Sequence, residues 1–331
     1  MKNNRAIAYY VIFGFLLILL FGADLIFGSV NISVKDLFTD SAGREIFLNF
    51  RLPKAIVALL SGIALSVCGL QMQTLFRNPL ADPYILGVSS GAGLGVAIYL
   101  MGLSIAGYKM ENTLVQSLGT AGAALAGAIV VTAIILYISR RVKSNLALLI
   151  FGVMLGFIAG ALVSLLQYAS SAHALKAYVL WTMGSFAALT SLQLYILAGL
   201  VAVGLVLCIL NIKNLNAILL GDEYATAVGL NVKKIRNRIL ISTTLLVGAV
   251  TAFCGPIGFI GIAVPHIARF IFKDADHKIL VPAVVIIGGA LALCADTLAG
   301  VISSGGVVPI NTMAALFGIP VILAIILRRN Q

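Results

Sequence analysis

The sequence predicts an all-α protein that crosses a membrane many times, and three observations carry this prediction. Of the 331 residues, 61% are hydrophobic and only 10% are charged, and the mean hydropathy is +1.11. Soluble globular domains, by contrast, carry about 25% charged residues. Uncharged runs of about twenty residues recur along the chain, each long enough to cross the hydrocarbon core of a bilayer. We therefore expect one transmembrane domain over residues 1–331.

The uncharged runs define the expected membrane spans in chain order. Six are read directly, at residues 6–23, 55–76, 83–108, 112–139, 279–302 and 309–327. The stretch 144–212 contains only Lys176 as a charged residue, which leaves room for two spans at about 146–168 and 190–210 with an outer segment between them. The run 239–268 is either one long helix or a tight pair broken at Gly255 and Pro256.

Basic residues decide between these two readings of the run 239–268, because cytoplasmic loops of membrane proteins carry an excess of Lys and Arg. A pair places sixteen of the 22 Lys and Arg residues on the inner side, whereas a single span divides them evenly. We therefore predict ten transmembrane helices with both termini cytoplasmic. The net charge of +11 then reflects inner loops and predicts no binding of nucleic acid. The first run also resembles a signal peptide, but it is long and lacks a good cleavage site.

The motif search excludes several classes of function. The chain has no G-x-x-x-x-G-K-[ST] and therefore no P-loop for nucleotide. Residues 87–91 match the G-x-S-x-G pattern of hydrolases around Ser89, but they open a hydrophobic span instead of joining a strand to a helix. We expect these glycines, with Gly93 and Gly95, to let helices pack closely. The four cysteines and three histidines lack metal-ligand spacing, so no metal, cofactor or catalytic residue is expected.

Two polar features remain as candidates for a functional role, Asp296 and the segment around Asp222. Asp296 is interpreted as the only acidic residue well inside a span, where it is expected to accept hydrogen bonds between helices in preference to relaying protons. On the inner side, Asp222 is expected to cap the N-terminus of a short helix by accepting backbone N–H bonds. The negative charge of Glu223 would be stabilised by the positive N-terminal end of the helix dipole. Gly229 would end the helix in a left-handed conformation. Leu220, Tyr224 and Val228 would then share one apolar face. That face is buried either on the protein's own spans or in the groove of a partner.

At this point the sequence resembles the FecCD-type permeases, the membrane subunits of type II ABC importers for iron-siderophores, haem and vitamin B12. The resemblance covers about residues 51–329 and rests on Arg51–Lys54, Met72–Pro83, Leu86–Gly93, Trp181–Phe186, Leu220–Gly229, Gly255–Gly261 and Pro265–Arg269. It implies a homodimer in the bacterial cytoplasmic membrane, with a cytoplasmic ATPase dimer and an extracytoplasmic substrate-binding protein as partners. The outer surface of the permease would contact membrane lipid. The permease itself would catalyse no reaction.

The resemblance also assigns roles to residues. It implies that the segment at about 220–230 is the coupling helix, through Leu220, Gly221, Asp222, Glu223, Tyr224, Ala225, Val228 and Gly229. A short outer helix at about 172–186 would lie beside the pathway, with Ser170, Ser171, His173, Lys176 and Trp181 as candidates. Arg51 and Lys54 match the R-L-P-R positions that dock the binding protein in vitamin B12 importers of this family, although a third basic position of those permeases is Gly300 in this chain.

Two other functions remain as alternatives from the residues alone. A proton-coupled secondary transporter would take up its substrate without an ATPase subunit. An intramembrane hydrolase would use Ser89 as its nucleophile.

Overall fold

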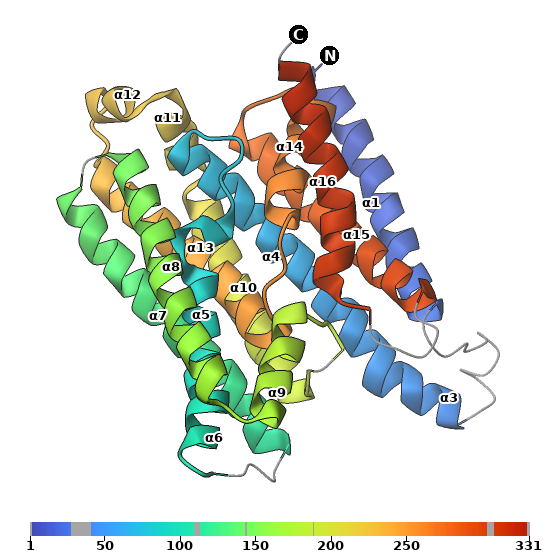
Figure 1. Ribbon diagram of the computed structural model, residues 1–331. Coiled ribbons are helices and arrows are strands. Elements are labelled where there is room, and N and C mark those ends of the chain that lie inside the picture. The colour runs from blue at the N-terminus through green and yellow to red at the C-terminus, as the bar shows by residue number, and fades with distance from the viewer. Residues whose placement is uncertain are drawn as a thin grey trace. The chain divides into compact units, whose positions relative to one another are not determined.

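The computed structural model describes residues 2–27, 41–108, 113–142, 144–187, 189–302 and 308–329, and every regular element within them is a helix (Figure 1). The longer helices are α1 (Lys2–Ile26), α4 (Leu52–Phe76), α5 (Val88–Ala97), α7 (Thr113–Arg141), α8 (Asn145–Ala169), α10 (Ser191–Leu210), α13 (Val232–Cys254), α15 (His277–Ile302) and α16 (Ile310–Arg329). The shorter ones are α3 (Ser41–Ile46), η1 (Phe47–Arg51), η2 (Pro83–Leu86), η3 (Ile98–Gly102), α6 (Leu103–Ile105), α9 (Ala172–Met183), α11 (Ile212–Leu220), α12 (Asp222–Ala227) and α14 (Ile260–Phe272).

The helices fall into two compact units. One unit comprises Met1–Leu70, Ser185–Ala198 and Ile257–Gln331, and the other comprises Gln71–Gly184 and Gly199–Pro256. In the first unit α15 packs against α1, α14 and α16, and in the second α5 packs against α7, α8 and α13. The single transmembrane domain expected from the sequence stays a prediction.

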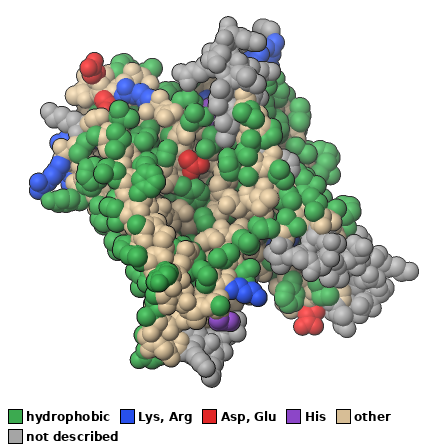
Figure 2. Space-filling model, in the orientation of Figure 1, with side chains coloured by type: hydrophobic (Ala, Val, Ile, Leu, Met, Phe, Trp, Pro, Cys, Tyr) green, Lys and Arg blue, Asp and Glu red, His purple; other side chains and the backbone are tan. Residues whose placement is uncertain are grey.

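Eight helices in the described residues are long and apolar enough to cross a membrane, and two shorter apolar helices, Ile260–Phe272 and Ile310–Pro320, accompany them. These ten elements correspond to the ten predicted spans. The two shorter helices have fewer residues than a full span needs, so the count of ten stays a prediction. Hydrophobic side chains also cover much of the surface, as Figure 2 shows for one face. A large exposed apolar surface of this kind is favourable in contact with lipid and unfavourable in contact with water. The protein is therefore a multi-pass membrane protein.

Three helix boundaries differ from those expected. The first helix runs on to Ile26 and so includes Asp24, which the sequence interpretation placed after the span. The span expected at 83–108 begins instead at Val88, because Pro83–Leu86 form a 3-10 turn that ends at Gly87 with a left-handed φ of 75°. The outer helix expected at 172–186 ends at Met183, where Gly184 adopts a positive φ of 73°.

The ambiguous run 239–268 is two helices, as the distribution of basic residues predicted. Helix α13 ends at Cys254 and α14 begins at Ile260. Gly255 has a φ of 77°, and a Cβ there would overlap the carbonyl oxygen of Trp181. A side chain at position 255 would therefore be both strained and obstructed.

Small residues set the closest helix contacts, as predicted for the glycine-rich stretch. In the second unit, a Cβ on Gly91 or Gly95 would collide with the backbone of α7 at Gly127 or Ala123. In the first unit, a Cβ on Gly62 would meet the carbonyl of Gly288 on α15. Without a hydrophobic driving force between helices in lipid, such close approach supplies the van der Waals contact that holds them together.

Candidate functional site

The segment Ile212–Leu230, which the sequence predicts to lie on the inner side, forms two short helices in the second unit. Helix α11 ends at Leu220, the backbone turns at Gly221 with a φ of 132°, and α12 follows at once. Gly229 ends α12 with a φ of 82°, its N–H bonds to the carbonyl of Thr226 at 3.0 Å, and the Leu230 N–H bonds to that of Ala225 at 2.9 Å. The left-handed glycine that the sequence predicted for this end is therefore confirmed.

The expected role of Asp222 as a helix cap was wrong. Gly221 occupies the cap position and Asp222 is the first residue of α12, where its carboxylate pairs with the guanidinium groups of Arg77 and Arg236. Two nearby cations attract a carboxylate more strongly than backbone N–H groups do, because a full charge acts at each end of the contact. Glu223 lies in the first turn of α12, as expected.

The apolar face of this segment is built differently from the prediction. Leu220 belongs to α11, so it does not share a helix with Tyr224 and Val228. All three side chains are nevertheless exposed, with 66%, 48% and 54% of their surface accessible, whereas Ala225 is fully buried. The chain's own helices therefore leave these three side chains uncovered.

Helix α9, which the sequence predicts to lie on the outer side, brings two of the five pathway candidates to one cavity. Ser171 caps α9 by accepting the Ala174 N–H at 3.4 Å, and its hydroxyl also bonds to that of Ser104 at 2.8 Å. Ser171 and His173 line a cavity of about 570 Å³ together with Tyr108 and Gln116. The other three candidates, Ser170, Lys176 and Trp181, are not among its lining residues.

Arg51 and Lys54 both make contacts within the first unit. Arg51 ends the π-helical turn η1, is only 9% exposed, and donates to the carbonyl oxygens of Leu25 and Ile26 at 3.4 and 3.0 Å. These are the last carbonyls of α1, whose negative helix end favours a cation. Lys54 lies one turn further along and places its ammonium 3.0 Å from a carboxylate oxygen of Asp296.

Sequence reasoning missed Asp24, the third member of this cluster. It is 4% exposed on α1, accepts the Thr297 hydroxyl at 3.1 Å and interacts with Asp296 and Lys54. Asp24 lies in the last turn of α1, which ends at Ile26, so it does not contradict the expectation that Asp296 is the acidic residue well inside a span. The signal was present in the sequence, because Leu25 and Ile26 continue the apolar run after Asp24.

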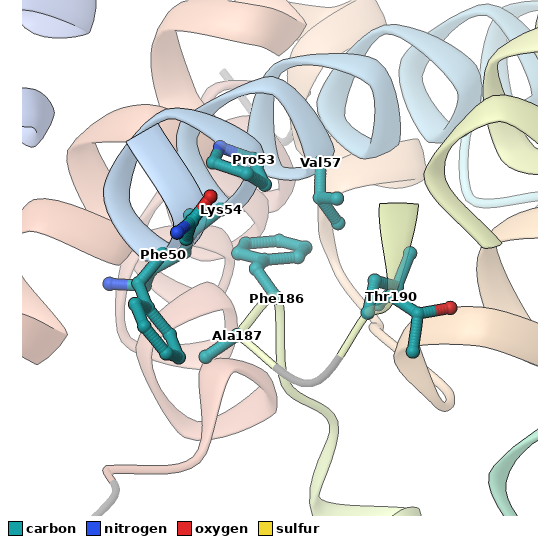
Figure 3. A pocket seen from close by; sticks show the side chains of 9 residues that line it. Phe50, Pro53, Lys54, Val57, Phe186, Ala187 and Thr190 are labelled. Carbon is teal, nitrogen blue, oxygen red and sulfur yellow. The ribbon is translucent and has the colours of Figure 1, made fainter. Parts of the chain in front are cut away.

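Lys54 also lines a second, smaller cavity of about 240 Å³ in the first unit. Figure 3 shows Phe50, Pro53 and Lys54 on one side of it and Phe186, Ala187 and Thr190 on the loop that faces them. The side chain of Lys54 is 28% exposed, so its ammonium contacts Asp296 while its stem remains accessible from outside the helix bundle of this unit.

The remaining motifs show no catalytic arrangement in the described residues. Ser89 follows the 3-10 turn η2 and lies in the first turn of α5, so the strand that a nucleophile elbow requires is not part of this motif. No group of three His, Cys, Asp or Glu side chains suited to a metal ion occurs in the parts of the chain that the structure describes.

Comparison with known proteins identifies the family. The model of the FecCD transport family matches residues 16–328. The chain belongs to the FecCD transport family. It is 37% identical over 337 residues to the hemin transport system permease protein HmuU of Yersinia pestis, covering 99% of this chain and 98% of that one.

Two further similarities support the family assignment. The vitamin B12 import system permease protein BtuC of Escherichia coli is 35% identical over 332 residues, covering 100% of this chain and 98% of that one. A solved inward-facing structure of a metal-chelate type ABC transporter superposes with a TM-score of 0.86 and 27% identity, covering 97% of this chain and 99% of that one. As a FecCD permease, the chain is a transport protein.

Proposed function

We propose that the chain is the permease subunit of a type II ABC importer that moves haem, cobalamin or an iron chelate across the bacterial cytoplasmic membrane. The names of the relatives support this range of cargo, since one carries hemin and another vitamin B12. The permease works as a homodimer with ten spans per subunit and both termini inside. A separate ATPase dimer supplies the energy, and a substrate-binding protein delivers the cargo.

The observation that carries the proposal is the uncovered apolar surface of α11 and α12. Leu220, Tyr224 and Val228 are exposed on a segment that the sequence places on the cytoplasmic side. Burying such side chains contributes about 25 cal/mol for each Å² of apolar surface removed from water. A cytoplasmic partner with an apolar groove would gain this free energy, and this is the role of a coupling helix on an ATPase subunit.

The partner must also distinguish two conformations of the permease. Binding and hydrolysis of ATP shift the inward-open and outward-open populations only if the ATPase dimer binds them with different affinity. The α11–α12 segment is the contact through which this difference acts. Gly221 suits such a segment, since nothing lies within 4 Å of where its Cβ would be and its φ of 132° is open to glycine.

On the outer side, Arg51 and Lys54 remain our candidates for docking the binding protein. Lys54 is the better placed of the two, because it is partly exposed beside the 240 Å³ cavity, whereas Arg51 is turned toward the end of α1. Acidic side chains of a binding protein would compete with Asp296 for the Lys54 ammonium. Cargo would then pass near α9, for which Ser170, Ser171, His173, Lys176 and Trp181 remain the candidates.

The substitution Val228→Asp tests the coupling role. A carboxylate in an apolar groove costs several kcal/mol if it is fully desolvated. We expect association with the ATPase subunit, stimulated ATP hydrolysis and uptake of haemin, cyanocobalamin or a ferric siderophore to fall together. Val228→Ile is the matched control, since it keeps the apolar surface and should behave as wild type. Full association and full uptake by Val228→Asp would contradict the proposal.

A further inference from the structure

Asp222 lies between two arginines that come from different segments of the second unit. Arg77 follows directly after α4 and bonds to carboxylate oxygen Oδ1 of Asp222, while Arg236 in the first turns of α13 lies 3.8 Å from oxygen Oδ2. Each oxygen of this one carboxylate therefore interacts with a different arginine. Sequence reasoning assigned Asp222 to the backbone of its own helix and gave Arg77 and Arg236 no role beyond the inner-side charge.

Both arginines are held in place by further hydrogen bonds. Arg77 donates from Nε to the carbonyl of Ile218 in α11 at 3.2 Å. Arg236 donates from an Nη atom to the carbonyl of Val142, just after α7, also at 3.2 Å, and its side chain is only 5% exposed. The carboxylate of Asp222 thus connects α12 with α11, with the ends of α4 and α7 and with the start of α13.

The backbone at Arg77 gives a second, independent sign that this arrangement is specified. Arg77 has a left-handed φ of 47° at the end of α4, where its N–H bonds to Thr74 and the next N–H bonds to Gln73. Glycine usually occupies this position, because a side chain there costs about 1 kcal/mol. A residue persists in such a conformation when its surroundings hold it there, and the Arg77 guanidinium contacts both Asp222 and Ile218.

We propose that Arg77, Asp222 and Arg236 form a clamp that transmits movement of the α11–α12 segment to α4 and α13. Asp222 is then a positioning residue of transport and makes no contact with the partner itself. This inference rests on the proposed coupling function. Without the clamp, α12 would still present Tyr224 and Val228 to the ATPase, but its displacement would be absorbed at Gly221 and Gly229, which both have positive φ values.

The alternative is an ordinary surface ion pair. Exposed pairs contribute only about 0–1 kcal/mol, and the Arg77 and Asp222 side chains are 42% and 36% exposed. Stability alone therefore does not distinguish a clamp from an ordinary pair. The amount of cargo moved for each ATP hydrolysed does, because an ordinary pair has no reason to affect this ratio.

The experiment uses the permease reconstituted in liposomes with its ATPase subunit and binding protein. Haemin uptake and phosphate release are measured on the same vesicles, with cyanocobalamin as the probe if wild type takes up no haemin. For Asp222→Asn and Arg77→Gln we expect normal association and continued ATP hydrolysis, with at least a five-fold fall in cargo moved for each ATP. Arg77→Lys, which keeps a positive charge beside Asp222, should retain most of the wild-type ratio.

Matched controls are Glu45→Gln and Arg140→Gln, which remove exposed charges of the same kind outside the clamp and should leave the ratio unchanged. An unchanged ratio in Asp222→Asn would overturn the clamp. So would loss of ATPase association in Asp222→Asn, since Asp222 would then be a contact with the partner. The proposed function fails by a separate result, full association and full uptake by Val228→Asp, so the two failures are distinguishable.

Discussion

The two units each contain an ionic cluster, and the clusters differ in burial. In the first unit Asp296 and Asp24 are 1% and 4% exposed, and Lys54 contacts Asp296 at 3.0 Å. In the second unit the Asp222 carboxylate is 36% exposed between Arg77 and Arg236. Water screens the second cluster far more than the first. The same types of side chain should therefore serve stability in one unit and the transmission of movement in the other.

The two clusters also differ in their ratio of acidic to basic side chains, since acids are in excess in the buried cluster and arginines in the exposed one. Asp24 and Asp296 are close enough to interact electrostatically, and one buried carboxylate oxygen of Asp24 has no hydrogen-bond donor. Lys54 supplies one positive charge, in direct contact with Asp296. In the exposed cluster a single acid is shared by two cations. The predicted consequences of removing one acid therefore differ in size.

The largest expected effect is that of Asp296→Asn. The change leaves the Lys54 ammonium without its anionic partner in a poorly solvated site, and breaking a buried pair costs about 3–5 kcal/mol. Because the Lys54 side chain is 28% exposed and can turn toward water, we expect about 3 kcal/mol. Chemical unfolding in detergent measures this, with Glu45→Gln as the control. A loss below about 1 kcal/mol would remove the contrast between the two clusters.

A carboxylate outside both clusters provides an intermediate case through pH. Asp82 accepts the Tyr84 N–H at 2.7 Å, and desolvation raises its pKa from 3.8 to about 6. The folded protein then holds this proton more tightly than the unfolded chain does. Stability is therefore greatest below about pH 4, declines as the pH rises to 6 and stays level above that.

The size of this decline is on the order of 1–2 kcal/mol, because Asp82 is partly exposed and the full shift is not realised. Unfolding midpoints of the detergent-solubilised protein between pH 4 and pH 8 measure it, with Asp82→Asn as the comparison. The variant should lose the decline between pH 4 and 6. An identical pH profile in the variant would show that another group titrates.

A smaller effect on stability is expected for Asp222→Asn. The pair is exposed, and the amide can still accept a hydrogen bond from one arginine, so we expect a loss of less than about 1 kcal/mol. The same unfolding measurement applies, at low and at high salt. A loss as large as that of Asp296→Asn would show that the exposed cluster is a stabilising element and that burial does not separate the two.

The smallest effect is expected for Asp24→Asn. The new amide can donate to the neighbouring Asp296 carboxylate, and the contact between two acids is relieved, so stability should change by less than about 0.5 kcal/mol in either direction. Chemical unfolding of this variant beside wild type tests the imbalance of the buried cluster. A destabilisation of several kcal/mol would mean that Asp24 acts as a charged partner of Arg51 or Lys54.

Much of this protein follows from the order of its residues alone. The spans follow from the length of uncharged runs, because the thickness of a bilayer sets the number of apolar residues in a helix. The end of α12 at Gly229 and the break of the chain at Gly255 follow from the ability of glycine to adopt a positive φ. The division of the run 239–268 into two helices was reached from the distribution of Lys and Arg, which reflects insertion into the membrane and not packing.

Only the tertiary structure decided which charges meet. Asp222 was expected to bond within its own helix, but it pairs with residues that are 145 and 14 positions away along the chain. Asp296 was expected to accept hydrogen bonds between helices, but only the packing shows that its neighbours are Lys54 and Asp24 from two other helices. Local propensity describes bonds between near neighbours, whereas the partner of a long charged side chain depends on how helices pack. That packing depends on all the side chains at each helix contact together, so a single segment does not reveal it.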